Sequence, residues 1–181
     1  YLFNRRPAHY LKIDKIPNLK FTALSIFLII SVQPIIAFTA YYNEQMQLPE
    51  SMSGIETAMR EMEESARAMM EQMLAGDSIT ILLVNLFIIA VMAGIVEEFL
   101  FRGELQQIIN KITSNYHIAV WVSAFIFSAI HFQFYGFVPR FILGALLGYM
   151  FVWSGNLWVP VIVHFTNNAM SVLLMKAYEN K

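Results

Sequence analysis

The chain has 181 residues, of which 57% are hydrophobic and 14% charged, and its formal net charge is −1. Soluble domains carry about a quarter charged residues, so this composition excludes an ordinary soluble domain and favours lipid as the surrounding solvent. The chain contains no cysteine, which excludes disulfide bonds and thiolate chemistry. We therefore expect the lipid bilayer as its environment and no nucleic-acid partner.

Five apolar stretches are long enough to cross a bilayer as helices, which takes about 20 residues each. They predict helices over residues 21–42, 78–97, 117–134, 138–153 and 157–175. The expected fold class is an all-α, polytopic transmembrane helix bundle. Residues 1–77 would form a basic N-terminus, one transmembrane helix and an acidic loop, and residues 78–181 would form a transmembrane core.

Prolines and glycines refine this arrangement. Pro34 falls inside the first span and predicts a kink, whereas Pro139 and Pro160 fall near the starts of the last two, where a missing N–H costs little. Gly144 and Gly148 lie four residues apart, a spacing of small residues that allows two helices to approach closely.

The distribution of charge predicts the orientation of the spans. Residues 1–20 hold five basic side chains against Asp14 alone, and the stretch after the second span holds Arg102 and Lys111 against Glu104. The loop over residues 43–77 holds eight acidic side chains and two arginines. Because basic residues favour the cytoplasmic side, we expect the first two stretches in the cytoplasm and the acidic loop outside.

The acidic loop has the pattern of an amphipathic helix. Apolar residues recur at helical spacing, at Ile55, Met59, Met62, Ala66, Met69, Met70 and Met73. The opposite face is charged and carries Glu56, Arg60, Glu63, Glu64, Arg67 and Glu71. Such a helix lies on the membrane surface or on the other spans, either as a simple packed element or as a lid that gates a substrate.

Two adjacent glutamates, Glu97 and Glu98, close the second apolar stretch. Ionisable groups within a membrane are costly and therefore indicate function. Arg102 follows Glu98 by four residues on the same helical face and can neutralise it, which leaves Glu97 free to face a cavity as a general base. The alternative interpretation is a helix end that reaches the interface and carries a structural Glu98–Arg102 pair.

Two histidines fall in separate predicted spans. His131 ends the stretch WVSAFIFSAIH, and His164 is followed one helical turn later by Asn168, which faces the same way. A lone histidine in an apolar helix is usually a core residue, but two beside a double glutamate favour a site. If the chain turns near residues 113–115 and remains helical on both sides, Glu97 and His131 lie at the same depth, about 21 Å from the turn.

Other catalytic patterns are absent or weak. No HExxH motif is present, and the only aspartates are Asp14 and Asp77, so neither a helical two-histidine zinc site of that type nor an aspartyl dyad fits. Ser128 precedes His131 by three residues, but no glycine-rich nucleophile turn surrounds it.

Three motifs in order resemble those of the CPBP intramembrane proteases, also called the CAAX-protease or Abi family. EEFLFR (97–102) resembles the EExxxR motif, FSAIH (127–131) resembles FxxxH, and HFTNN (164–168) resembles HxxxN. The resemblance covers about residues 78–175. Because the family fold has about eight helices, we expect the five spans here to form part of a larger bundle.

The resemblance also implies roles for the motif residues. Glu97 would activate water with the assistance of His131, His164 and Asn168 would stabilise the oxyanion, and Glu98 with Arg102 would shape the site. Family members are described both as metal-dependent and as metal-free glutamate proteases. Carboxylate and imidazole ligands suit Zn²⁺, so zinc at Glu97, His131 and His164 stays open as a cofactor.

The predicted function is therefore that of an intramembrane endopeptidase, an integral membrane enzyme that resides in the cell membrane if its source is prokaryotic. Its substrate would be a peptide or protein at the membrane, and the resemblance includes lipidated proteins among the substrates. The alternative is a non-enzymatic transporter or partner-binding scaffold that uses the same polar cluster. A transporter often shows inverted repeats and broken helices, and the sequence shows neither.

Overall fold

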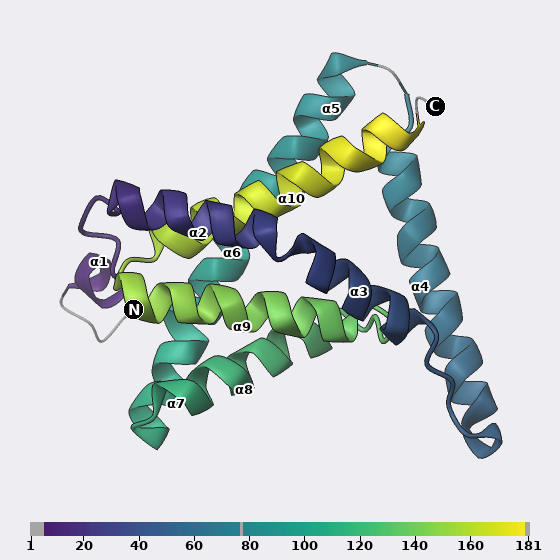
Figure 1. Cartoon of the computed structure of the whole chain (residues 1–181), viewed down its shortest axis with the longest axis horizontal. Coiled ribbons are helices and arrows are strands. Elements are labelled where there is room, and N and C mark those ends of the chain that lie inside the picture. The colour runs from purple at the N-terminus through teal and green to yellow at the C-terminus, as the bar shows by residue number, and fades with distance from the viewer. Residues whose placement is uncertain (1–5, 77, 180–181) are drawn as a thin grey trace.

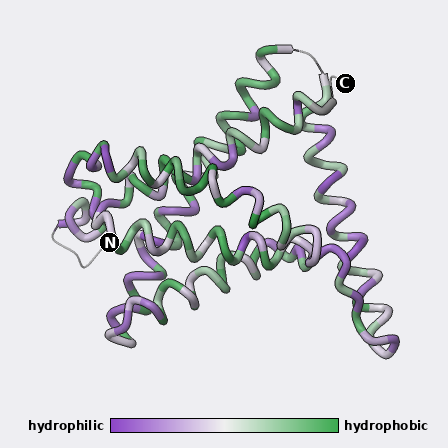
Figure 2. Tube along the Cα trace, viewed as in Figure 1, coloured by the Kyte–Doolittle hydropathy of each residue, from purple (hydrophilic) through white to green (hydrophobic). Residues whose placement is uncertain are grey.

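The computed structural model describes residues 6–76 and 78–179, which form helices and connecting turns without a strand. Within these residues, four helical segments are long and apolar enough to cross a membrane, namely Leu19–Glu44, Ile79–Thr113, Phe137–Ser154 and Trp158–Ala177. Figure 2 shows hydrophobic residues along most of these segments. The chain is an integral membrane protein, as its composition predicts.

The first span consists of two helices joined by a bend. Helix α2 (Leu19–Ser31) ends at Val32, and helix α3 (Gln33–Glu44) begins at the next residue with Pro34 in its first turn. The predicted kink is therefore confirmed. It arises because proline lacks the N–H that a continuous helix would use.

The second span is longer than predicted. A continuous helical segment of 35 residues, Ile79–Thr113, comprises α5 (Ile79–Asn85), η2 (Leu86–Met92), α6 (Ala93–Glu98), η3 (Phe99–Leu105) and α7 (Gln106–Thr113). Both η2 and η3 are π-helical. At 1.5 Å per residue the segment is about 52 Å long, so it extends well beyond a hydrocarbon core of about 30 Å.

The third predicted span, over residues 117–134, is wrong at its C-terminal end. Helix α8 (Tyr116–Ala129) has 14 residues and stops at Ile130. The chain then turns through Phe132, whose φ of 53° is left-handed. Asn43 at the end of α3 holds this turn, because its amide donates to Phe134 O at 3.0 Å and its oxygen accepts from Val138 N at 2.8 Å.

Helix α9 (Phe137–Ser154) lies at the centre of the bundle (Figure 1). A Cβ added at Gly144 would come within 3.1 Å of the Phe127 ring, and one at Gly148 within 3.0 Å of Val120. Both neighbours belong to α8, so the small-residue spacing brings these two helices together, as expected. Helix α10 (Trp158–Glu179) packs against α2, α6 and α9.

The predicted amphipathic helix is helix α4 (Ser53–Leu74), which follows the short turn η1 (Glu50–Met52). Figure 1 shows α4 at the side of the bundle, and α5 and α10 contact it. Its polar face carries the i,i+4 ion pairs Glu56–Arg60 at 2.8 Å and Arg67–Glu71 at 3.1 Å. Such pairs stabilise a solvated helix face.

The N-terminal segment covers the turn between α9 and α10. It contains helix α1 (Pro7–Tyr10), and Leu157 N donates to Lys12 O at 3.1 Å. Asn156 Nδ2 likewise donates to Lys15 O at 2.7 Å. Leu11 is buried in a cluster with Phe151 and Leu157, so this segment is fixed to the bundle.

Candidate active site

The two glutamates lie in a short α-helical stretch between two π-helical ones. Glu97 and Glu98 end α6, with η2 before it and η3 after it. A π-turn adds a residue to a helical turn and often marks a functional site. The Glu98 side chain is completely buried, whereas that of Glu97 is 28% exposed. Successive residues on a helix point about 100° apart, so the two carboxylates have different surroundings.

Arg102 neutralises Glu98 in the bundle interior. Its Nη1 donates to Glu98 Oε1 at 2.8 Å, and its Nη2 donates to Gly144 O in α9, also at 2.8 Å. The guanidinium also lies 5.0 Å from the centre of the Phe127 ring in α8. The predicted Glu98–Arg102 pair is therefore formed, and Arg102 makes no such contact with Glu97.

Close packing of α10 against α6 brings His164 to both glutamates. A Cβ at Gly94 would come within 3.3 Å of Phe165 N, so only a small residue permits this approach. His164 Nδ1 lies 2.8 Å from Glu98 Oε1, and Nε2 lies 3.8 Å from Glu97 Oε2. Because Glu98 pairs with Arg102, its carboxylate is expected to accept a hydrogen from Nδ1, which directs Nε2 of His164 toward Glu97.

His131 reaches the site from the turn after α8 rather than from a transmembrane helix. Its Nδ1 lies 2.8 Å from Phe127 O, and a carbonyl can only accept, so Nδ1 carries the hydrogen. In a neutral ring Nε2 is then left with a lone pair. The Phe127 ring makes edge contacts with His131 at 5.2 Å and with His164 at 6.1 Å between centroids. One phenyl ring therefore contacts both imidazoles, and the charge of Glu97 acts on His131.

Asn168 lies one helical turn beyond His164 on α10. Its Nδ2 donates to Ile89 O in η2 at 3.0 Å, and its Oδ1 accepts from Asn167 Nδ2 at 3.2 Å. Asn167 in turn accepts from Gln33 Nε2 at 3.0 Å. The amide of Asn168 is thus oriented from both sides, and its second N–H hydrogen remains for another acceptor.

The sequence interpretation missed Arg140, in the first turn of α9. Its Nη2 donates to Gln133 Oε1 at 2.6 Å, and its Nη1 is buried without a hydrogen-bond partner among the described residues. The charges of Glu97 and Glu63 act on it. The sequence held one signal for this residue. Arg140 is the only lysine or arginine between Lys111 and Lys176, and it falls within an apolar span.

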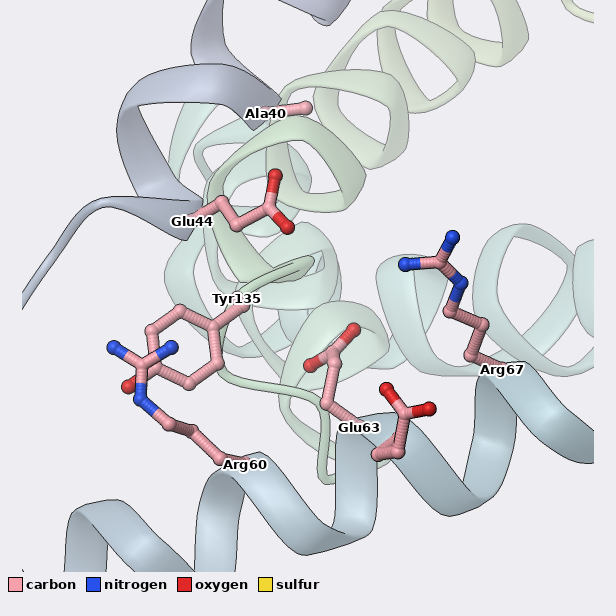
Figure 3. Close-up of a pocket in the computed structure, with 7 residues that line it drawn as sticks. Ala40, Glu44, Arg60, Glu63, Arg67 and Tyr135 are labelled. Carbon is pink, nitrogen blue, oxygen red and sulfur yellow. The ribbon is translucent and has the colours of Figure 1, made fainter.

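A cavity of about 540 Å³ lies near the turn that carries His131. Figure 3 shows Glu44 entering it from α3, Arg60, Glu63 and Arg67 from α4, and Tyr135 from the turn. Arg60 stacks over the Tyr135 ring at 4.4 Å. This cavity contains none of the motif residues.

In the described part of the chain, no three His, Asp or Glu side chains group at metal-binding spacing. Glu97 Oε2 and His164 Nε2 lie 3.8 Å apart, close to the spacing of two ligands on one zinc ion, but among the described residues no third carboxylate or imidazole is grouped with them. The chemistry of the site is therefore derived below from its own side chains.

Comparison with known proteins assigns the family. A family model described as type II CAAX prenyl endopeptidase Rce1-like matches residues 79–170, which is half of the chain and includes all the motif residues. The chain belongs to the Rce1-like family. The resemblance inferred from the three motifs is thereby confirmed.

Two curated bacterial proteins are similar to this Rce1-like chain. It is 33% identical over 90 residues to the uncharacterized protein YpbD of Bacillus subtilis, and the matched region covers 48% of this chain and 43% of YpbD. It is also 33% identical over 95 residues to the membrane-embedded CAAX protease MroQ of Staphylococcus aureus, which covers 49% of this chain and 38% of MroQ. The chain thus matches less than half of the length of these relatives. No solved structure matches it significantly.

Proposed function

We propose that this chain contains the catalytic centre of an intramembrane endopeptidase, in which Glu97 activates water for attack on a peptide bond. The observation that carries the proposal is the position of Glu97. Its partly exposed carboxylate lies 3.8 Å from Nε2 of a histidine that a second, neutralised carboxylate holds in place. One water molecule can contact both atoms across such a gap.

In the proposed reaction, Glu97 removes a proton from water, and the hydroxide attacks the carbonyl carbon of the substrate. The carbonyl oxygen then bears the negative charge of a tetrahedral intermediate. When this intermediate collapses, the C–N bond breaks and the protonated Glu97 gives its proton to the leaving amine. Protons and charge balance over the cycle without a covalent enzyme intermediate.

His131 would orient the attacking water. Since its Nδ1 hydrogen is bonded to Phe127 O, the lone pair on Nε2 can accept a hydrogen bond from water. The Phe127 ring holds the imidazole from its other side. In this role His131 raises the fraction of time that the water spends in line with the carbonyl carbon.

His164 and Asn168 would stabilise the oxyanion. Protonated on both nitrogens, His164 keeps its Nδ1 bond to Glu98 and presents an Nε2–H donor. Two carboxylates, Glu97 and Glu98, would then be balanced by two cations, Arg102 and His164. The remaining N–H of Asn168 supplies a second donor, and each preorganised donor of this kind is worth about 10²–10³-fold in rate.

The substrate would be a peptide or protein segment that enters the bilayer, and lipidated proteins belong to this class. The name of MroQ, a membrane-embedded CAAX protease, and the family description both support a proteolytic activity. The transporter or scaffold alternative uses the same cluster without turnover.

The test is cleavage of a quenched fluorescent peptide by the full chain in proteoliposomes, with and without a chelator. Glu97→Gln should lower turnover at least about 10²-fold while the protein remains folded. Glu61→Gln, which removes an exposed carboxylate on α4, serves as the matched control and should leave turnover unchanged. Near-normal turnover by Glu97→Gln would overturn the enzymatic proposal and favour the alternative. Full activity in the presence of chelator would show that catalysis needs no metal ion and would leave the enzymatic proposal intact.

A further inference from the structure

A second polar pocket lies far along the bundle from the glutamate and histidine cluster. It has a volume of about 150 Å³ and opens where the N-terminal segment crosses the α7–α8 turn and the last turns of α9. Figure 1 shows these three parts at the same end of the molecule. Two lysines, Lys12 and Lys111, line it together with side-chain amides, and no carboxylate is among its lining residues in the described chain.

Lys12 is held at this pocket by the fold. Its backbone has a left-handed φ of 59°, and its carbonyl accepts from Leu157 N. Such a conformation persists in a non-glycine residue only where its surroundings fix it. The ammonium lies 4.7 Å from the centre of the Phe151 ring. Burial lowers the pKa of Lys12, and no carboxylate of the described residues lies within ion-pair distance to offset this desolvation.

Lys111 and Gln106 complete the pocket from α7. The Lys111 ammonium lies 4.6 Å from the centre of the Tyr10 ring, and it too has no ion pair with a described carboxylate. Gln106 is only 3% exposed, and its Nε2 donates to Gly148 O at 3.1 Å. Gln106 thus fixes α7 against α9 at the inner wall of the pocket.

The pocket therefore offers two cations for an anion. The phosphate group of a lipid headgroup is such an anion. The pocket also lies at the end of the transmembrane helices, where lipid headgroups are found, and on the side that the charge distribution assigns to the cytoplasm. Basic residues in this position attract anionic lipids.

We propose that this pocket binds the phosphate group of an anionic phospholipid, with Lys12 and Lys111 on the phosphate oxygens. This inference does not depend on the proposed proteolytic activity. A soluble phosphate ester has the same chemistry, so the experiment has an arm for each source.

The experiment is native mass spectrometry of the full chain in detergent, titrated with phosphatidylglycerol or phosphatidylcholine. Phosphatidylglycerol should bind more tightly, and Lys12→Gln and Lys111→Gln should each weaken it about fivefold, the effect of one basic residue at an anionic surface. The double variant should lose about 25-fold. Lys20→Gln removes a nearby exposed charge outside the pocket and should bind as the wild type does.

Two further variants guard against a failure to fold. Lys12→Arg retains the charge and should bind normally, and Lys111 is exposed, so Lys111→Gln leaves the packing intact. If glycerol phosphate at millimolar concentration competes with the lipid, the ligand of the pocket is a soluble phosphate ester bound by the same residues. Equal binding of both lipids, or undiminished binding of phosphatidylglycerol by Lys111→Gln and the double variant, would overturn the proposal.

Discussion

Truncation of Arg102 to alanine should destabilise the protein more than any change at Glu97. Arg102 is 1% exposed and its partner Glu98 is 0% exposed, so the variant removes the guanidinium from a buried carboxylate and leaves it only its bond to His164. Breaking a buried pair in this way costs about 3–5 kcal/mol. For a chain of this size, each kcal/mol lowers the melting temperature by about 2–4 °C, which predicts a fall of about 6–20 °C.

The assay is thermal unfolding in detergent, followed by tryptophan fluorescence, with Glu97→Gln as the matched control. Glu97 is outside the ion pair, so its neutral variant should melt close to the wild type. The double change Glu98→Gln with Arg102→Met removes both charges and should recover most of the lost stability. It should not recover cleavage, because His164 then loses the carboxylate that orients it. Equal melting of Arg102→Ala and the wild type would refute the buried pair.

Three further predictions follow from the same geometry. In intact cells, an impermeant thiol reagent should label a cysteine placed at Gln45 but not one at Lys15; the reverse pattern would overturn the orientation. His131→Ala should lower cleavage at least about 10²-fold, and adding Glu97→Ala should lower it little further, since residues that act as a unit are not additive. If His164 only stabilises the oxyanion, the His164→Ala variant should retain a trace of activity. This trace is measured as turnover above that of Glu97→Ala.

Local patterns in the sequence were sufficient for much of the fold. Apolar length predicted four of the five spans correctly, whereas the third is only a 14-residue helix, and Pro34 predicted the bend between α2 and α3. The spacing of Glu98 and Arg102 predicted their ion pair, because residues four apart on a helix are neighbours whatever surrounds the helix. The chain also remains helical from Glu97 to the turn after Thr113, as the depth argument requires, since η3 and α7 follow α6 without a break.

Contacts between distant segments were beyond the reach of such patterns. His131 was expected within a helix, but Asn43, some 90 residues earlier, holds the chain in a turn at that point. A helical repeat contains no information about a partner so far away in the sequence.

The chemistry of the site likewise depends on tertiary structure. The sequence by itself determined which residues are able to act as base and imidazole, because carboxylates and histidines are rare in its apolar stretches. Only the packing of α10 on α6 at Gly94 decided that His164 bonds to Glu98 and faces Glu97. Only the tertiary structure brought the charges of Glu63 and Glu97 to act on Arg140, at the start of α9. Intrahelical spacing is fixed by the backbone, whereas interhelical distances depend on how side chains from separate helices fit together.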